Sequence, residues 1–222
     1  DLETPVSAFL KVARPPYAFL LESVEGGERV ARYSFLGTEP ARVITTGAGT
    51  PLGPVDPLRE VQAALAPYRP VSLPGLPRFT GGLVGYLSYE AVRYFEPRVP
   101  PPSQGVLGIP ESLFLVVDTL LVFDHLRHVI RVITNLRLDG DPEGAYRRAE
   151  AKVRRLVQRL SRPLRPPVKT GPVPAPAEGP PWASNFTREG YEAVVRRARE
   201  YIEAGDVIQV VPAQRFSRPT RA

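Results

Sequence analysis

Apolar residues recur at helical spacing in four stretches of the chain, and each stretch is preceded by a side chain that can cap a helix. In three of them the capping residue is followed by proline, which suits the first helical position. The four predicted helices begin after Thr4, Asp56, Asp141 and Thr187. Gly205 stands where a glycine commonly ends the last helix.

Runs rich in β-branched and aromatic residues between these helices predict strands. Residues 25–28, Glu-Gly-Gly-Glu, supply the turn of a first hairpin, and residues 124–128, which contain both histidines, supply the polar tip of a second. The last run is apolar on both faces apart from Gln209, as expected for a buried strand. The predicted strands are residues 17–23, 29–36, 42–46, 81–89, 113–123, 129–136 and 207–211.

Elements in this order predict an α+β fold with mixed, mainly antiparallel sheets and flanking helices. The presence of more than one hairpin disfavours a doubly wound parallel fold. Gly81, Gly82 and Gly85 lie within a predicted strand and do not open a helix, so they do not form a nucleotide-binding fingerprint. Their missing side chains indicate that another backbone or a ligand comes close, and packing against a neighbouring element is the simpler interpretation.

The composition changes abruptly after the third predicted helix. Residues 161–184 contain eight prolines and almost no large apolar side chains, which is typical of a stiff, extended linker. We therefore predict an N-terminal lobe over residues 1–160, a proline-rich linker over residues 161–184 and the start of a second lobe at residues 185–222. Because the chain contains no methionine, not even an initiator, we expect it to be part of a longer protein.

Composition also narrows the possible chemistry. The absence of cysteine excludes disulfides, thiolate metal ligands and a cysteine nucleophile. No apolar run approaches the ~18 residues of a membrane helix and the first residues do not form a signal peptide, so a cytoplasmic protein is expected. The 29 basic residues outnumber the 23 acidic ones, but the densest basic cluster lies on the polar side of the third helix. This arrangement favours a solvated helix face over a nucleic-acid surface.

Three places are candidates for chemistry: the polar end of the first strand, the glycine strand and Gln209. A polar side chain in a buried strand must be hydrogen-bonded or face a cavity, because leaving it unpaired costs about 1 to 3 kcal/mol. None of these places specifies a reaction, since the sequence shows no Ser–His nucleophile pair and no phosphate-binding loop. His125 and His128 have no accompanying cluster of carboxylates, so no metal site is predicted.

Four segments resemble the successive signatures of one enzyme family. In their order and spacing they are similar to anthranilate synthase component I, and they span nearly the whole chain. The related aminodeoxychorismate synthase component I shares the layout, but the Glu-Ser pair and the Arg-Tyr-Ser-Phe run are more similar to the anthranilate enzyme. The segments are Leu-Leu-Glu-Ser at 20–23, Arg-Tyr-Ser-Phe-Leu-Gly at 32–37, Gly-Gly-Leu-Val-Gly-Tyr-Leu-Ser-Tyr-Glu at 81–90 and Ala-Gly-Asp-Val-Ile-Gln-Val-Val at 204–211.

The resemblance implies a chorismate-utilising lyase of tryptophan biosynthesis, with a component I type sandwich fold that is incomplete at the C-terminal end. Such an enzyme uses magnesium and ammonia to convert chorismate to anthranilate and pyruvate. A glutamine amidotransferase subunit supplies the ammonia within a hetero-oligomer. Because the magnesium ligands and most catalytic residues belong to a part of the family's sequence that this chain lacks, residues 1–222 are expected to be inactive alone.

The resemblance also implies a regulatory site at the end of the first strand. Leu21, Glu22 and Ser23 would line a pocket for the feedback inhibitor tryptophan, and Arg32 and Ser34 would help to close it. Such a site suits a free amino acid, whose ammonium needs oxygen acceptors, whose carboxylate needs donors and whose indole needs an apolar slot. The alternative is that Glu22 and Ser23 merely end the strand and that Arg32 is a surface charge.

Gln209 is the one candidate near the reacting substrate. Relatives that add water to chorismate carry lysine at the matching position as a candidate base, whereas glutamine, which cannot act as a base, suits amination by ammonia. The alternative is that Gln209 only satisfies a buried backbone group. A non-enzymatic α+β module that grips nucleic acid with its basic helix is a remote alternative, and its binding would depend steeply on salt.

Overall fold

The chain divides into two compact units, Asp1–Arg165 and Pro166–Ala222. The boundary between them falls within the proline-rich segment 161–184. The turn predicted at residues 25–28 lies outside the described residues. The computed structural model describes residues 3–22, 32–100, 108–138, 140–164 and 181–219.

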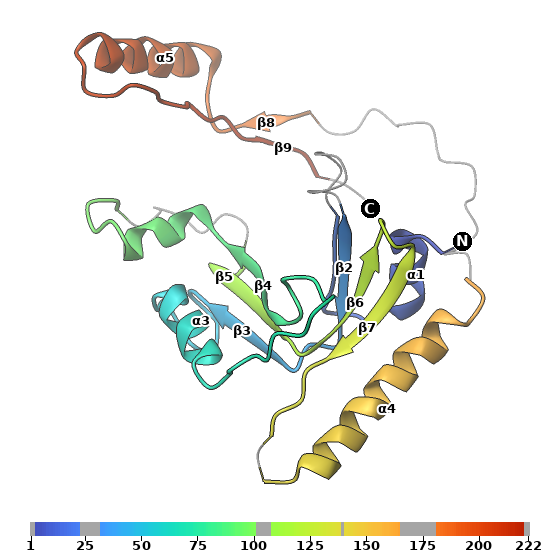
Figure 1. Cartoon of the computed structure of the whole chain (residues 1–222). Coiled ribbons are helices and arrows are strands. Elements are labelled where there is room, and N and C mark those ends of the chain that lie inside the picture. The colour runs from blue at the N-terminus through green and yellow to red at the C-terminus, as the bar shows by residue number, and fades with distance from the viewer. Residues whose placement is uncertain (1–2, 23–31, 101–107, 139, 165–180, 220–222) are drawn as a thin grey trace. The chain divides into compact units, whose positions relative to one another are not determined.

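The first unit contains two sheets (Figure 1). The four-stranded sheet has the order β1-β2-β6-β7, and the three-stranded sheet has the order β3-β5-β4. Neighbouring strands in both sheets are antiparallel, so the predicted α+β fold with mainly antiparallel sheets is confirmed. The strands are β1 (Ala18–Leu21), β2 (Tyr33–Thr38), β3 (Arg42–Thr46), β4 (Gly82–Leu87), β5 (Ser112–Val117), β6 (Thr119–Asp124) and β7 (Val129–Thr134).

The predicted helix starts in this unit are confirmed. Thr4 Oγ1 and Asp141 Oδ1 each accept a hydrogen bond from the backbone N–H three residues ahead, at 3.1 and 2.9 Å. Helix α3 (Pro57–Leu65) begins after Asp56 and packs against β4. A short 3₁₀ helix, η1 (Tyr89–Tyr94), follows β4. Local capping chemistry therefore sets where these helices begin.

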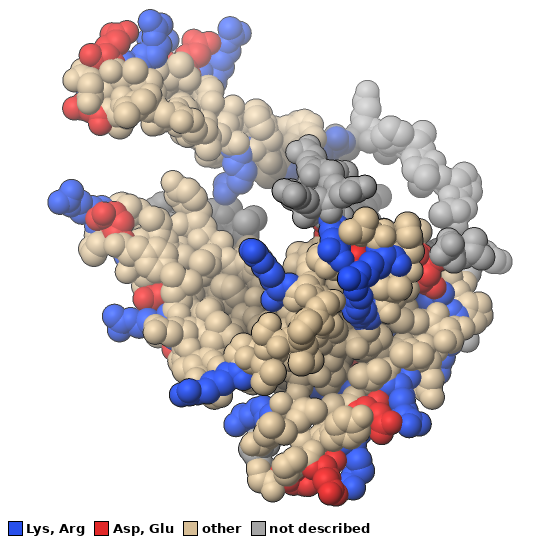
Figure 2. Space-filling view, in the orientation of Figure 1, with Lys and Arg blue, Asp and Glu red and all other residues tan. Residues whose placement is uncertain are grey.

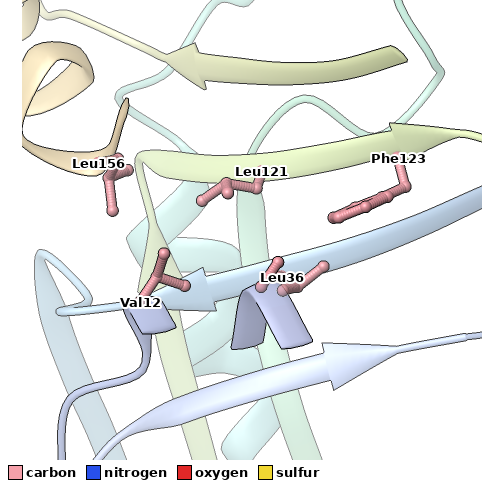
Figure 3. Close-up of a cluster of buried hydrophobic side chains, with 6 residues drawn as sticks. Val12, Leu36, Leu121, Phe123 and Leu156 are labelled. Atoms are coloured by element: carbon pink, nitrogen blue, oxygen red, sulfur yellow. The ribbon is translucent and has the colours of Figure 1, made fainter. Parts of the chain in front are cut away.

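One core lies between the four-stranded sheet and two helices, α1 (Pro5–Val12) and α4 (Pro142–Leu160). Alternate residues of β2 and β6 point toward these helices, because successive side chains of a strand face opposite sides of the sheet. Burying each of the larger side chains stabilises the fold by roughly 1.5 to 3 kcal/mol. Figure 3 shows members of this core pointing toward one another from helices and strands: Val12, Leu36, Leu121, Phe123 and Leu156.

A second core lies between the two sheets. Leu115 and Val117 of β5 meet Leu120 and Val122 of β6 in this core. Since β6 also contributes alternate residues to the core beneath the helices, this strand is buried on both faces. The four-stranded sheet is thus the middle layer of the unit, with α1 and α4 on one side and the three-stranded sheet on the other.

The prediction of a single strand over residues 113–123 is wrong. The run is divided at Asp118 into β5 and β6, which belong to different sheets. The Asp118 carbonyl accepts a 2.7 Å hydrogen bond from the backbone N–H of Asn135, and its carboxylate lies 2.6 Å from Lys152 Nζ. Both halves of the run are rich in apolar residues, and only Asp118 and Thr119 separate them, so the run was predicted as one strand.

The glycine strand is explained at one position by close packing. Strand β4 pairs with β5, and a Cβ atom at Gly85 would lie 1.9 Å from the carbonyl oxygen of Leu113. No side chain fits at that distance. Packing against a neighbouring strand therefore explains the glycine at position 85, as the simpler interpretation of the sequence predicted.

The second unit contains helix α5 (Arg188–Glu203) and a short ladder of β8 (Ala183–Ser184) with β9 (Phe216–Ser217). Thr187 caps the helix as predicted, with its side chain accepting a hydrogen bond from the helix backbone. Gly205 follows the helix with a φ of 81°, the left-handed conformation that glycine adopts without strain.

The prediction of a buried strand over residues 207–211 is wrong. The structure assigns no strand to this segment, and Ile208 is 99% exposed. A strand needs a neighbour to pair its backbone N–H and C=O groups. Within residues 181–219 the ladder of β8 and β9 is the only pairing, so this apolar segment has no sheet to join.

Candidate functional site

A row of polar side chains lies where β1, β2 and β6 end together. In the antiparallel register Leu21 is opposite Phe35, so Glu22, the next residue along, comes beside Ser34. Ser34 is in turn opposite Phe123 of β6. Leu21 and Glu22 are exposed, whereas Ser34 is only 2% exposed. The end of the sheet therefore presents an apolar side chain and a carboxylate to solvent, above a buried hydroxyl.

The Ser34 hydroxyl has two side-chain partners. Its Oγ lies 2.7 Å from His125 Nε2 and 3.4 Å from Glu22 Oε1. The His125 ring stacks on Phe123, with ring centroids 6.3 Å apart and planes inclined by 27°. This row, Glu22–Ser34–His125, is called the polar row below. It lies on the side of β2 and β6 that packs against α1 and α4, just beyond the last apolar residues of that side.

Arg32 belongs to a neighbouring ion cluster. Its Nε and Nη2 atoms lie 3.0 and 2.9 Å from the two carboxylate oxygens of Asp124, and Arg131 Nη1 lies 3.1 Å from the same carboxylate. The backbone N–H of Arg127 donates a fourth hydrogen bond at 3.2 Å. The Asp124 side chain has no exposed surface, so this cluster satisfies a buried charge.

The cluster shifts the pKa values of both partners. Hydrogen bonds from Arg32 hold the pKa of Asp124 well below its usual range, although burial of the carboxyl opposes this shift, and Arg131 and the Arg127 N–H add to it. The hydrogen bond to Asp124 raises the pKa of Arg32 in return. Both groups are therefore charged at neutral pH.

The structure brings together only some of the residues predicted to form the tryptophan pocket. Glu22 and Ser34 are in contact, and Leu21 adjoins them in sequence. Arg32 is held by Asp124, which faces the opposite side of the sheet from the adjacent residue Phe123. Ser23 lies outside the described residues.

His125 and Asp124 were not predicted to be members of these groups. Both were placed at the polar tip of the second hairpin, without partners. Their partners, Ser34 and Arg32, are 91 and 92 residues away in sequence, and the pairing of β2 with β6 brings them together. The sequence does show polar residues at the ends of both strands, but only the strand register shows which of them meet.

The structure does not place Gln209 in a strand. It lies in an exposed segment between α5 and β9, so its predicted role beside the substrate stays a prediction. In the described part of the chain, no group of three or more His, Cys, Asp or Glu side chains is arranged to hold a metal ion. Within the same residues, no helix has both the length and the apolar character needed to cross a membrane.

The basic side of α4 is largely paired with acidic residues. Figure 2 shows Lys and Arg interspersed with Asp and Glu on the visible face of the first unit. Two of these pairs are i,i+4 pairs within the helix, worth only a few tenths of a kcal/mol each, and three join α4 to residues outside it. Together they offset part of the positive charge that a phosphate backbone would need. The pairs are Arg147–Glu143, Arg148–Asp141, Lys152–Asp118, Arg154–Glu150 and Arg159–Glu39.

Comparison with known protein families shows to which family the chain belongs. The family described as chorismate binding enzyme matches residues 16–222, which is most of the sequence. The chain belongs to this chorismate-binding enzyme family. The resemblance identified from the four sequence segments is therefore confirmed.

Individual relatives of the chorismate-binding family are named anthranilate synthase component 1. The protein of Pseudomonas aeruginosa is 41% identical over 98% of this chain, that of Thermus thermophilus 40% over 99%, and that of Saccharomyces cerevisiae 34% over 98%. The chain covers 46%, 46% and 44% of these relatives, so it spans less than half of their length.

A solved structure supports the fold of this family member. The crystal structure of anthranilate synthase component I from Streptococcus pneumoniae TIGR4 matches 93% of this chain and 45% of its own, with a TM-score of 0.56 and 22% sequence identity. At that identity the match shows a shared fold. The mixed helix and antiparallel sheet architecture is therefore that of part of an anthranilate synthase component I structure.

Proposed function

We propose that this chain is part of anthranilate synthase component I, which aminates chorismate and releases pyruvate to leave anthranilate. The balanced reaction consumes chorismate and ammonia and yields anthranilate, pyruvate and water. Family membership and the names of relatives that match nearly the whole chain support this proposal. Since the chain spans less than half of those relatives, the complete reaction is assigned to the longer protein.

The proposal extends to the partners of the reaction. A glutamine amidotransferase subunit would deliver ammonia within a cytoplasmic hetero-oligomer, and Gln209 would lie near chorismate. The described residues do not fit a magnesium site, because they contain no suitable group of ligands, so no step in this chain is assigned to the ion. Aminodeoxychorismate synthase component I is the alternative assignment, and the names of the relatives favour the anthranilate enzyme.

The polar row is proposed as the site of feedback inhibition by L-tryptophan. The observation that carries this assignment is the hydrogen-bonded contact of an exposed carboxylate, Glu22, with the buried hydroxyl of Ser34 at the end of β1 and β2. Glu22 supplies a negative charge for the ligand's ammonium. Leu21 is exposed, but as the preceding strand residue it faces the other side of the sheet, so its contact with the indole stays a prediction. Ser23 would complete this side of the site.

The ligand carboxylate needs a donor, and Arg32 was predicted to supply it. Its partner Asp124 faces the side of the sheet away from the polar row, so a contact of Arg32 with the ligand stays a prediction and is not part of the polar-row site. Feedback would follow if tryptophan binds one arrangement of the complete enzyme better than another.

Calorimetric titration with L-tryptophan tests the proposed site. We expect saturable binding to the chain, with L-phenylalanine binding more weakly. Glu22→Gln, which keeps the shape and removes the charge, should weaken tryptophan binding by at least about tenfold, because a charge-assisted hydrogen bond is worth roughly 1.5 to 3 kcal/mol.

Glu150→Gln is the control, because Glu150 is likewise an exposed glutamate but lies on α4, where it pairs with Arg154. Its tryptophan affinity should equal that of the unmodified chain. Absence of saturable binding would overturn the site, and equal losses in both variants would show that Glu22 has no specific role.

A further inference from the structure

Ser34 cannot meet a ligand directly. It is 2% exposed, whereas both of its side-chain partners, Glu22 and His125, are exposed. A ligand that arrives from solvent therefore meets the two ends of the polar row and not its centre. Any effect of the Ser34 hydroxyl on binding must pass through one of these two residues.

The hydrogen bonds of the polar row have a required direction. A carboxylate can only accept, so Ser34 donates its single hydroxyl hydrogen to Glu22. The short 2.7 Å contact with His125 must then be a hydrogen bond in which Nε2–H donates to Ser34 Oγ. If Ser34 donated to His125 instead, the hydrogen bond to Glu22 would be lost.

The two hydrogen bonds of Ser34 differ in length. The distance of 2.7 Å between Ser34 and His125 is typical of a firm hydrogen bond, and the 3.4 Å between Ser34 and Glu22 is long for one. His125 is itself steadied by stacking on Phe123. The hydroxyl is thus anchored on the histidine side, and its hydrogen bond to Glu22 restrains the exposed carboxylate.

We propose that His125 is a positioning residue for the ammonium site: it donates to Ser34, which donates to Glu22, which accepts from the ligand's ammonium. Ser34 and the ammonium both donate to the Glu22 carboxylate, so Ser34, itself held by His125, fixes the orientation of the carboxylate before the ligand arrives. This inference rests on the proposed tryptophan site and adds a residue that contacts the ligand only through others. Loss of His125 should therefore affect recognition of the ammonium and spare recognition of the indole.

Two substitutions separate the hydrogen bond from the ring. His125→Phe keeps an aromatic ring against Phe123 and removes the donor, while His125→Gln keeps an N–H that can reach Ser34. His128→Asn is the control, because His128 lies on the same hairpin with a φ of 52°, a conformation that asparagine tolerates. Each variant is titrated with L-tryptophan and with indole-3-propionate, which lacks the ammonium group.

We expect His125→Phe to weaken L-tryptophan roughly tenfold and to change indole-3-propionate less than about twofold. His125→Gln should restore tryptophan binding to within about threefold, and His128→Asn should bind both ligands normally. In a Glu22→Gln background, His125→Phe should have no further effect, because the relay no longer ends on a charge.

The outcomes distinguish this inference from the proposal on which it rests. If the unmodified chain does not bind tryptophan, the proposed site itself fails. If it binds tryptophan and His125→Phe binds equally well, or loses both ligands to the same extent, the relay is refuted and His125 has no positioning role. Failure of His125→Gln to restore binding would refute it as well.

Discussion

Asp124 offers the most direct test of how the first unit is held together at the candidate site. Its buried carboxylate accepts two hydrogen bonds from Arg32, one from Arg131 and one from the backbone N–H of Arg127. In Asp124→Asn one oxygen remains, but an NH₂ group replaces the other and faces donors. At least two hydrogen bonds to a charged group are lost, each worth about 1.5 to 3 kcal/mol.

The expected loss of stability at neutral pH is therefore about 3 to 5 kcal/mol, which agrees with the cost of breaking a buried ion pair. For a unit of this size, 1 kcal/mol corresponds to roughly 2 to 4 °C, so the melting temperature should fall by about 10 °C. Urea unfolding followed by circular dichroism measures the difference. Asp56→Asn is the control, since asparagine is an equally good N-cap and the change should cost less than about 0.5 kcal/mol.

The pH dependence gives a second and independent check on Asp124. Its pKa is lowered in the folded state, so its contribution to stability is fully present above the unfolded value, about 3.9, and is lost as pH falls toward the folded value. The difference between the unmodified chain and Asp124→Asn should be largest near pH 7 and shrink below about pH 4. A loss under about 1 kcal/mol at pH 7, or a difference that stays constant down to pH 3, would refute this reasoning.

Two further predictions concern the glycine strand and catalysis. Gly85→Ala should destabilise the first unit by about 1 to 3 kcal/mol, because its Cβ would overlap the carbonyl oxygen of Leu113; an unchanged urea midpoint would contradict the packing account. Residues 1–222 should form no anthranilate from chorismate, ammonia and magnesium when anthranilate fluorescence is followed, and magnesium-dependent turnover would contradict the assignment of the catalytic residues to the longer protein.

The local signals in the sequence determined the helices and most of the strands. Thr4, Asp56, Asp141 and Thr187 cap helices where predicted, because a cap needs only a side-chain oxygen within one turn of the backbone it serves. The α+β class followed from the order of these elements. The family followed from four short segments, and the match over residues 16–222 confirmed it.

Long-range pairing was decided by the tertiary structure alone. Asp118 and Thr119 interrupt the apolar run at the break, but two polar residues do not by themselves show that β5 and β6 join different sheets. The segment 207–211 has the pattern of a buried strand, but among residues 181–219 it pairs with no other strand. In both cases the spacing of apolar residues indicates which side chains are suited to burial, whereas strand pairing depends on which other segments come near.

The candidate site shows the same division between sequence and structure. Glu22 and Ser34 were identified from segments that resemble a known family, and their contact became visible only in the register of β1 with β2. The sequence placed His125 and Asp124 at a hairpin tip without partners. Residues about 90 positions apart meet there because antiparallel pairing brings the ends of β2 and β6 together, and no local pattern carries that information.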